Sequence, residues 1–116
     1  PEDATVVDAP DRIETLLEAV GDAGCRAIIG ATGERALSAN ELSESCDLPL
    51  STTYRKLGLL TDAGLLDERT RVRRSGKHAS EYVRLVEDVL VSVDEAETAL
   101  YVTWRDEADP ADAASD

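Results

Sequence analysis

Residues 38–66 of the chain read Ser-Ala-Asn-Glu-Leu-Ser-Glu-Ser-Cys-Asp-Leu-Pro-Leu-Ser-Thr-Thr-Tyr-Arg-Lys-Leu-Gly-Leu-Leu-Thr-Asp-Ala-Gly-Leu-Leu. Ser38 and Glu41 have the spacing of a capping box, in which the hydroxyl accepts a hydrogen bond from a backbone N–H of the helix and the Glu carboxylate accepts one in return. A second helix opens near Pro49, because proline is tolerated in the first turn of a helix. It ends before Gly64, since glycine suits the left-handed conformation that follows many helices. The stretch therefore predicts two short helices joined by a tight turn.

The second of these helices has an apolar side and a polar side. Thr53, Leu57 and Leu60 recur at helical spacing, so we expect them to face the core. Hydroxyl and basic groups fall on the other faces, near the start of the helix. Two short helices arranged in this way are typical of a helix-turn-helix, whose second helix enters the major groove of DNA.

A hairpin is predicted directly after the second helix. Residues 65–72 and 79–85 form its strands, and the turn between them is rich in arginine. Residues 69–80 hold five Lys or Arg residues and no acidic one, although the whole chain has a net charge of −13. A basic island on an acidic molecule indicates a local anion site; the alternative is a solvated hairpin tip. Two strands closed by a basic loop after a helix-turn-helix make a wing.

The flanking segments are expected to complete one small α+β domain. Residues 11–20 and 22–32 have the apolar stripes of helices. Residues 88–105 alternate as in a second hairpin, rich in strand-favouring residues, although a helix also fits. We therefore expect a winged helix-turn-helix with an N-terminal helix and a C-terminal hairpin or helix for dimerisation. Its parts are a flexible arm at 1–10, a DNA-binding domain at 11–87 with a recognition helix at about 50–63 and a wing at about 65–85, a dimerisation element at 88–105 and a disordered acidic tail at 106–116.

The composition is strongly acidic. The 116 residues include 25 acidic and 12 basic ones, and 42% of them are hydrophobic, too large a share for a disordered acidic chain. An ordinary acidic cytosolic protein is one interpretation. A protein of a high-salt cytoplasm fits best, because salt at about 1 M screens charge repulsion beyond roughly 3 Å. No apolar run is long enough to span a membrane and no signal peptide is visible, so we expect a cytoplasmic protein with no membrane partner.

Four strings carry a resemblance to a known family. They are Ser-Ala-Asn-Glu-Leu-Ser at 38–43, Ser-Thr-Thr-Tyr-Arg-Lys-Leu at 51–57, Ala-Gly-Leu-Leu at 63–66 and Ser-Glu-Tyr at 80–82. With them, residues 22–85 resemble the ArsR-like winged helix-turn-helix regulators, especially the small acidic ones of haloarchaea. The resemblance implies a homodimer that binds a pseudo-palindromic operator in double-stranded DNA, and a role in stress control, including oxidative stress. The Cys-x-Cys signature of the metal-sensing members is absent, so we expect no metal and no organic cofactor.

The predicted DNA contacts lie on the second helix and on the hairpin. Residues near the N-terminus of a recognition helix reach base edges first, and a wing tip lies over the minor groove, where a narrow groove favours arginine. We expect Lys56 to contact a phosphate or a surface carboxylate, and Arg71 to reach a phosphate or pair with an acid. Ser51 and Thr52 have an alternative role as helix caps. The predicted set is Ser51, Thr52, Tyr54, Arg55, Lys56, Arg71, Arg73, Arg74, Lys77 and His78.

Two further sets of candidates concern assembly and redox chemistry. The dimer interface is expected to combine the helix at 11–20 with the C-terminal segment; the alternative is that the same side chains complete the monomer core. Cys25 and Cys46 are candidate redox sensors, although Cys25 lies on an apolar stripe typical of a buried cysteine. The predicted interface residues are Ile13, Leu16, Leu17, Val20, Leu100, Val102 and Trp104.

These patterns together predict a dimeric transcription regulator that binds specific double-stranded DNA and is not an enzyme. The alternative is a winged-helix module that binds another protein of the transcription machinery, but the basic hairpin near Arg55 favours DNA. So acidic a chain should be repelled by phosphates. We therefore expect acids such as Asp62, Asp67 and Glu68 to face DNA across bridging inorganic cations.

Overall fold

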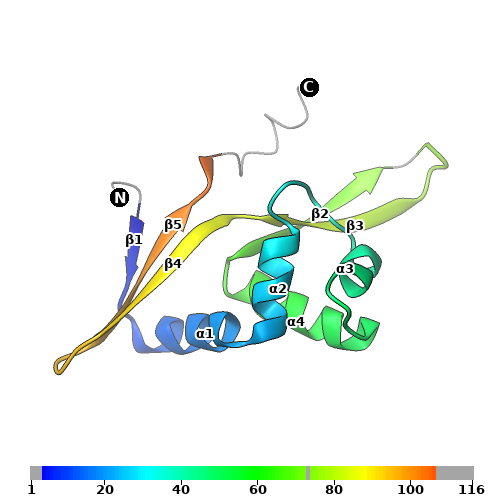
Figure 1. Cartoon of the computed structure of the whole chain (residues 1–116). Coiled ribbons are helices and arrows are strands. Elements are labelled where there is room, and N and C mark those ends of the chain that lie inside the picture. The colour runs from blue at the N-terminus through cyan, green and yellow to red at the C-terminus, as the bar shows by residue number, and fades with distance from the viewer. Residues whose placement is uncertain (1–3, 73, 107–116) are drawn as a thin grey trace.

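The computed structural model describes residues 4–72 and 74–106, which form four helices and five strands (Figure 1). The helices are α1 (Pro10–Gly21), α2 (Ala23–Ala31), α3 (Ala39–Ser45) and α4 (Leu50–Asp62). The strands are β1 (Ala4–Val7), β2 (Leu66–Val72), β3 (His78–Arg84), β4 (Val86–Val93) and β5 (Thr98–Trp104). β2 and β3 form a two-stranded sheet, and β5 lies between β1 and β4 in a three-stranded one.

Local side-chain chemistry sets the ends of three helices. Ser38 and Glu41 make both hydrogen bonds of the capping box of α3, at 3.2 and 2.9 Å. Asp22 caps α2, because its carboxylate accepts a hydrogen bond from the backbone N–H of Cys25 at 2.8 Å. Gly64 follows α4 with a φ of 78°, a conformation that glycine adopts without steric cost. The capping box and the position of Gly64 agree with the predictions from the sequence.

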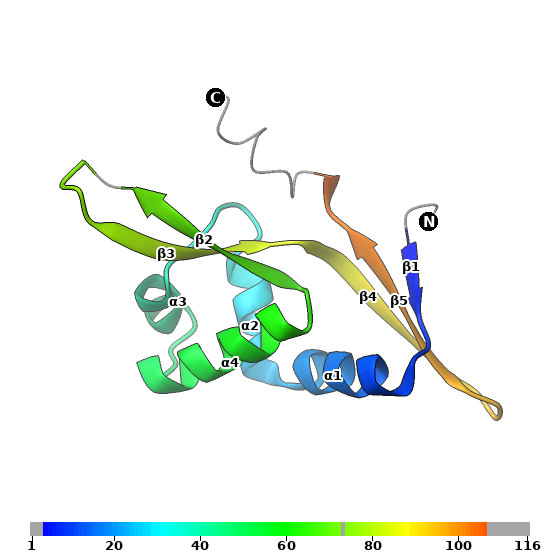
Figure 2. The same ribbon diagram turned by 180° about the vertical axis from the view of Figure 1, so that it is seen from behind.

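The β2–β3 hairpin is the predicted wing. Its strands are antiparallel, with Leu66 opposite Arg84 where the hairpin leaves the body. It extends away from the helices, beyond α3, in both views of the chain (Figures 1 and 2). Tyr82 exchanges two backbone hydrogen bonds with Leu37, at 2.8 and 3.2 Å, which tie the hairpin to the segment before α3. The fold is thus the α+β winged helix-turn-helix that the sequence predicted.

The C-terminal segment forms strands, so the hairpin prediction is confirmed and the helix alternative is wrong. β4 and β5 pair antiparallel, with Val89 opposite Val102. The carboxylate of Asp94 holds the turn between them, because it accepts hydrogen bonds from the backbone N–H groups of Ala96 and Glu97 at 2.8 and 2.9 Å.

The N-terminal segment contains a strand where the sequence predicted a flexible arm. β1 pairs with β5, from Ala4 opposite Thr103 to Val7 opposite Leu100. The indole N–H of Trp104 adds a hydrogen bond to the hydroxyl of Thr5 at 2.9 Å. Residues 1–3 of the predicted arm and residues 107–116 of the predicted acidic tail lie outside the described residues.

One core joins the helices to the three-stranded sheet. Four residues predicted for the dimer interface belong to it: Ile13, Leu16, Leu100 and Val102 are at most 7% exposed. They complete the monomer core, so their assignment to an interface is wrong. The other three lie half-buried against the same core: Leu17, Val20 and Trp104.

The two hairpins are fastened to each other and to α2. The guanidinium of Arg84 donates hydrogen bonds to the carbonyls of Val86 and Glu87, at 2.7 Å each, and to that of Ile29 at 3.4 Å. Leu85 lies between β3 and β4 and bonds to both hairpins. Its backbone N–H donates to the carbonyl of Leu65 at 3.0 Å, and its carbonyl accepts the backbone N–H of Arg105 at 3.0 Å. The wing is therefore an extension of the same body that contains the core.

Leu60→Ala should destabilise the fold strongly, because Leu60 on α4 is fully buried and its truncation leaves a cavity. We expect the free energy of unfolding to fall by about 2–5 kcal/mol, measured by urea denaturation followed by circular dichroism. Leu50→Ala in the same helix is the control, since Leu50 is 40% exposed. An equal loss of unfolding free energy in the two variants would contradict the burial of Leu60 and the exposure of Leu50.

Candidate nucleic-acid interface

α4 turns one side to the core and the other to solvent. The predicted core stripe is buried, with Leu57 and Leu60 at most 1% exposed. The opposite side carries polar groups, among them Tyr54 at 54% exposure. Four of the predicted DNA contacts lie on this outer side, exposed or half-buried: Ser51, Thr52, Tyr54 and Arg55. α4 therefore exposes hydroxyls and a guanidinium to solvent.

Lys56 does not belong to this outer side, although the sequence placed it among the DNA contacts. The residue is 9% exposed, and its Nζ lies 2.6 Å from Oδ2 of Asp22. Of the two contacts predicted for Lys56, the structure shows the one with a carboxylate, that of Asp22, and its place among the DNA contacts is corrected. The signal in the sequence was weak, because Lys56 directly follows Arg55 and precedes Leu57, at the border between the two sides of the helix.

Asp22 is held in its charged form by this pair. The hydrogen bond from Lys56 and, next, that from the backbone N–H of Cys25 lower the pKa of Asp22 to about 2. The carboxylate therefore stays ionised at any pH at which the protein would work, and Lys56 keeps its counter-charge.

The hairpin is basic at its tip and charge-paired lower down. Arg74, Lys77 and His78 are exposed near the tip, whereas Arg73 lies outside the described residues. Arg71 forms an ion pair with Glu81 across the two strands. Of the alternatives predicted for Arg71, the structure favours pairing with an acid.

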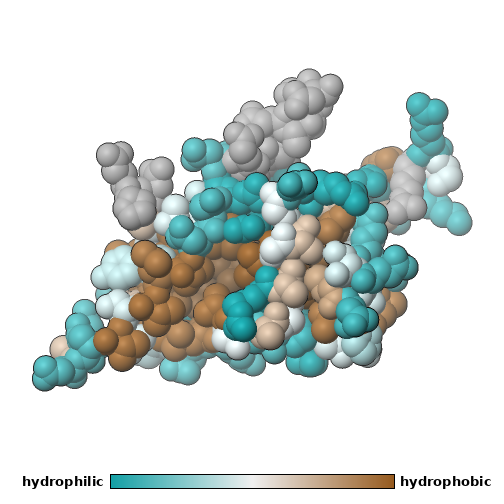
Figure 3. Space-filling model, viewed as in Figure 1, coloured by the Kyte–Doolittle hydropathy of each residue, from teal (hydrophilic) through white to brown (hydrophobic). Residues whose placement is uncertain are grey.

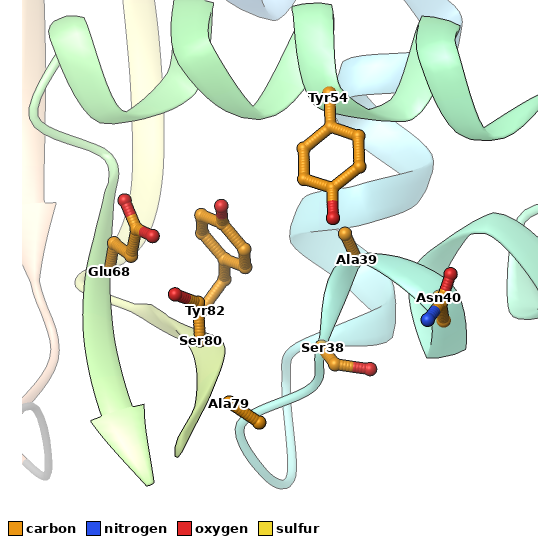
Figure 4. A pocket seen from close by; sticks show the side chains of 8 residues that line it. All are labelled: Ser38, Ala39, Asn40, Tyr54, Glu68, Ala79, Ser80 and Tyr82. Carbon is orange, nitrogen blue, oxygen red and sulfur yellow. The ribbon is translucent and has the colours of Figure 1, made fainter. Parts of the chain in front are cut away.

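A hollow of about 270 Å³ lies between α3, α4 and the hairpin (Figure 4). At one end, Tyr82 lies near Glu68, and burial, followed by the Glu68 charge, raises the pKa of Tyr82. At the other end lie Asn40 and Ser38, from the start of α3 (Figure 4). The lining consists of Ser38, Ala39, Asn40, Tyr54, Glu68, Ala79, Ser80 and Tyr82. Sequence reasoning missed Ser38, Asn40 and Ser80 as surface donors, because only folding brings the start of α3 next to β3.

The cysteines have the wrong environment for thiolate sensors. Cys25 is fully buried, and burial, assisted by the Asp22 carboxylate, raises the pKa of its thiol to about 11. Cys46 is half-buried, and burial also raises its pKa. A reactive sensor requires a lowered pKa and access to solvent, so neither thiol is favoured for that role.

Two kinds of feature are absent from the described part of the chain. Residues 4–72 and 74–106 contain no group of three or more His, Cys, Asp or Glu side chains placed to hold a metal ion. In the same ranges, no helix combines the length and apolar character needed to cross a bilayer.

The end of the molecule away from the wing carries an apolar surface. Figure 3 shows a continuous hydrophobic area over α1, α2 and β4. On β4, Val91 and Val93 are 47% and 71% exposed, and their strand register puts them on the sheet side that also carries Leu100. We call this surface the apolar patch; it comprises Leu17, Val20, Ile29, Val89, Val91 and Val93.

A second apolar row crosses the opposite side of the same sheet. The register aligns Val6, Tyr101 and Leu90 on the three neighbouring strands, and these side chains are 55%, 38% and 57% exposed. Of the apolar patch, the sequence predicted Leu17 and Val20; it did not reveal the rest of the patch or this second row, because the strand pairing was unknown.

Comparison with known families and structures agrees with the fold. Residues 20–69 match a family described as a helix-turn-helix domain. No curated protein matches the chain. Among solved structures, the homodimeric winged helix-turn-helix DNA-binding domain (fragment 1–100) of a possible ArsR-family transcriptional regulator from Mycobacterium bovis is similar, with a TM-score of 0.54 and 16% identity. The match covers 64% of each chain, so the present chain spans less than two thirds of that fragment.

Two further structures are similar. A possible transcriptional regulator from Methanosarcina mazei has a TM-score of 0.51 and 16% identity over 72% of this chain and 76% of its own. HlyU from Vibrio cholerae has a TM-score of 0.47 and 21% identity over 84% of this chain and 80% of its own. The Mycobacterium and Methanosarcina structures share 16% sequence identity with the chain, and at that level the similarity shows only a common winged helix-turn-helix fold.

Proposed function

We propose that the chain is a transcription regulator that binds specific double-stranded DNA as a homodimer. One observation carries this proposal: the polar outer side of α4, with Arg55 exposed, belongs to the same body as a hairpin whose tip exposes Arg74 and Lys77. In a helix-turn-helix, the second helix enters the major groove and the first crosses the backbone. The helix-turn-helix match over residues 20–69 supports the proposal.

Each group then has a specific task. Arg55 is suited to grip a guanine, because its guanidinium can donate two parallel hydrogen bonds to one base edge. The side chains of Ser51, Tyr54 and Asn40 can donate to phosphate oxygens, which fixes the register without reading sequence. The exposed cations of the hairpin tip reach the adjacent minor groove. The buried Lys56 takes no part in these contacts.

Arg55→Ala should weaken and broaden DNA recognition. The wild-type chain would first select its preferred site from a random double-stranded library, and both chains would then be titrated with the selected and the scrambled site. We expect a loss of about 1–3 kcal/mol on the selected site and a smaller loss on the scrambled one. Arg26→Ala is the control, since Arg26 on α2 bonds the carbonyl of Val20. Unchanged affinity of Arg55→Ala for the selected site would show that Arg55 does not contact a base. Failure of the wild-type chain to select any site would contradict the proposed function.

The homodimer is proposed to form through the apolar patch. A continuous exposed apolar area on a protein surface commonly marks a site of interaction with another molecule. The patch lies over α1, α2 and β4, away from the hairpin tip, so two copies joined there would leave both hairpin tips free (Figures 1 and 3). The similar Mycobacterium domain is described as homodimeric, which supports this assembly.

Val91→Asp should convert the dimer into a monomer, because it places a charge in the apolar patch. Leu90→Asp is the matched control: it is the adjacent residue on the same strand, points to the opposite side of the sheet and is similarly exposed. Light scattering at high salt should show twice the 12.5 kDa chain mass for the wild type and Leu90→Asp, and a single mass for Val91→Asp. The reverse result would place the interface on the row of Val6, Tyr101 and Leu90.

We further propose that the acidic surface suits a high-salt archaeal cytoplasm, and that the regulator serves a stress response. The support is the net charge of −13 and the sequence resemblance to haloarchaeal regulators. Asp62, Asp67 and Glu68 are exposed on α4 and on the adjoining strand β2. If these carboxylates approach phosphates, cations are needed between them.

The salt dependence of binding tests this part of the proposal. An ordinary DNA-binding protein loses affinity as salt rises, because each phosphate it neutralises releases condensed cations. Here uptake of bridging cations should offset that release, so the slope of log affinity against log salt should be flat or positive from about half molar potassium chloride upward. Lys replacements of Asp62, Asp67 and Glu68 should restore a negative slope. A steep negative slope for the folded wild-type chain would rule out cation bridging.

A further inference from the structure

Lys56 is a basic residue of the helix proposed to read DNA, yet it points inward. Its Nζ lies 2.6 Å from Oδ2 of Asp22, and its side chain is 10% exposed. The same Oδ2 atom accepts the backbone N–H of Cys25 at 2.8 Å, the hydrogen bond that caps α2. A single carboxylate oxygen thus joins the start of α2 to the middle of α4.

Gly24 provides the space for this side chain. A Cβ atom at position 24 would lie 2.6 Å from Cε and 2.9 Å from Cδ of Lys56, closer than non-bonded carbons approach. Gly30, in the same helix, has nothing within 4 Å of such an atom. The aliphatic stem of Lys56 therefore lies against the backbone of α2 at Gly24, where no side chain intervenes.

We propose that Lys56 is a positioning residue, which fixes the rotation of α4 about its own axis and so the direction in which Arg55 and Tyr54 project. The proposal rests on the DNA-binding function proposed above. The other contacts of α4 with the core are largely apolar, and such contacts are non-directional. The pair is buried at its lysine end and partly exposed at Asp22; such an ion pair adds little net stability but requires one geometry. Because Lys56 is next to Arg55 in the helix, the geometry of the ion pair also sets the direction in which Arg55 projects.

A cycle of two substitutions separates positioning from stability. Asp22→Asn keeps an oxygen for the cap of α2 but removes the charge, and Lys56→Met keeps the length of the stem. Each single change should lower the melting temperature, because it leaves one charge without its partner. The double change should recover most of that loss. Its preference for the selected over the scrambled site should nevertheless remain reduced by about tenfold, similar to one mismatched base pair.

Gly24→Ala tests the same idea with both charges intact. Alanine normally favours a helix more than glycine, but here its Cβ displaces the stem of Lys56. Gly24→Ala should therefore reduce the site preference by a similar factor, whereas the matched control Gly30→Ala should leave it unchanged. An equal preference of the Gly24→Ala and Gly30→Ala variants for the selected over the scrambled site would overturn the proposal.

The orientation of α4 provides a readout that does not depend on DNA. Residual dipolar couplings of backbone N–H groups in the free protein would give the orientation of α4 relative to α2. We expect a changed orientation in the double variant and in Gly24→Ala, and the native one in Gly30→Ala. Native couplings in all variants, or changed couplings with full site preference, would overturn the proposal. A wild-type chain that selects no DNA would instead overturn the proposed function, and the couplings would still decide whether the pair holds α4.

Discussion

The structure depends on burying one side of α4 while the other side remains in solvent. Leu57 and Leu60 belong to the same core as Ile28 of α2 and Val102 of β5, so one core holds the helices and the three-stranded sheet together. Burial of apolar surface contributes about 25 cal/mol per Å² and decides which side of α4 faces the core. It is non-directional, so it does not fix the exact rotation of the helix about its axis. The ion pair of Lys56 with Asp22 supplies the directional contact at the border of the two sides.

Features set by local chemistry were predictable from the sequence. The capping box of Ser38 and Glu41, the cap at Asp22 and the left-handed Gly64 each depend on residues within three or four positions of one another. The wing and the C-terminal hairpin follow from alternation and from turn residues. For the candidate interface, spacing alone placed Tyr54 and Arg55 on the outer side of α4.

Features that depend on distant partners were not predictable. β1 is four residues long, and nothing within it shows that β5 lies at the other end of the chain. Helical periodicity identified Ile13 and Leu16 as apolar but could not tell a monomer core from a dimer contact. Lys56 carries the same ambiguity, since a lysine at the edge of an apolar stripe can turn either way. Its direction is set by Gly24, a residue on another helix.

The distribution of charge follows from these contacts. Several basic side chains have partners within the chain: Lys56 pairs with Asp22, Arg71 pairs with Glu81, and the guanidinium of Arg84 donates to backbone carbonyls. In the described part of the chain, basic groups on the candidate interface that no acid neutralises gather on α4 and at the hairpin tip. On so acidic a chain, the position of these exposed cations matters more than the net charge for the proposed binding of a polyanion, because attraction depends on the local field. If the chain binds DNA as proposed, the acidic background would disfavour non-specific contacts, and the few exposed cations would contribute to discrimination more than to overall attraction.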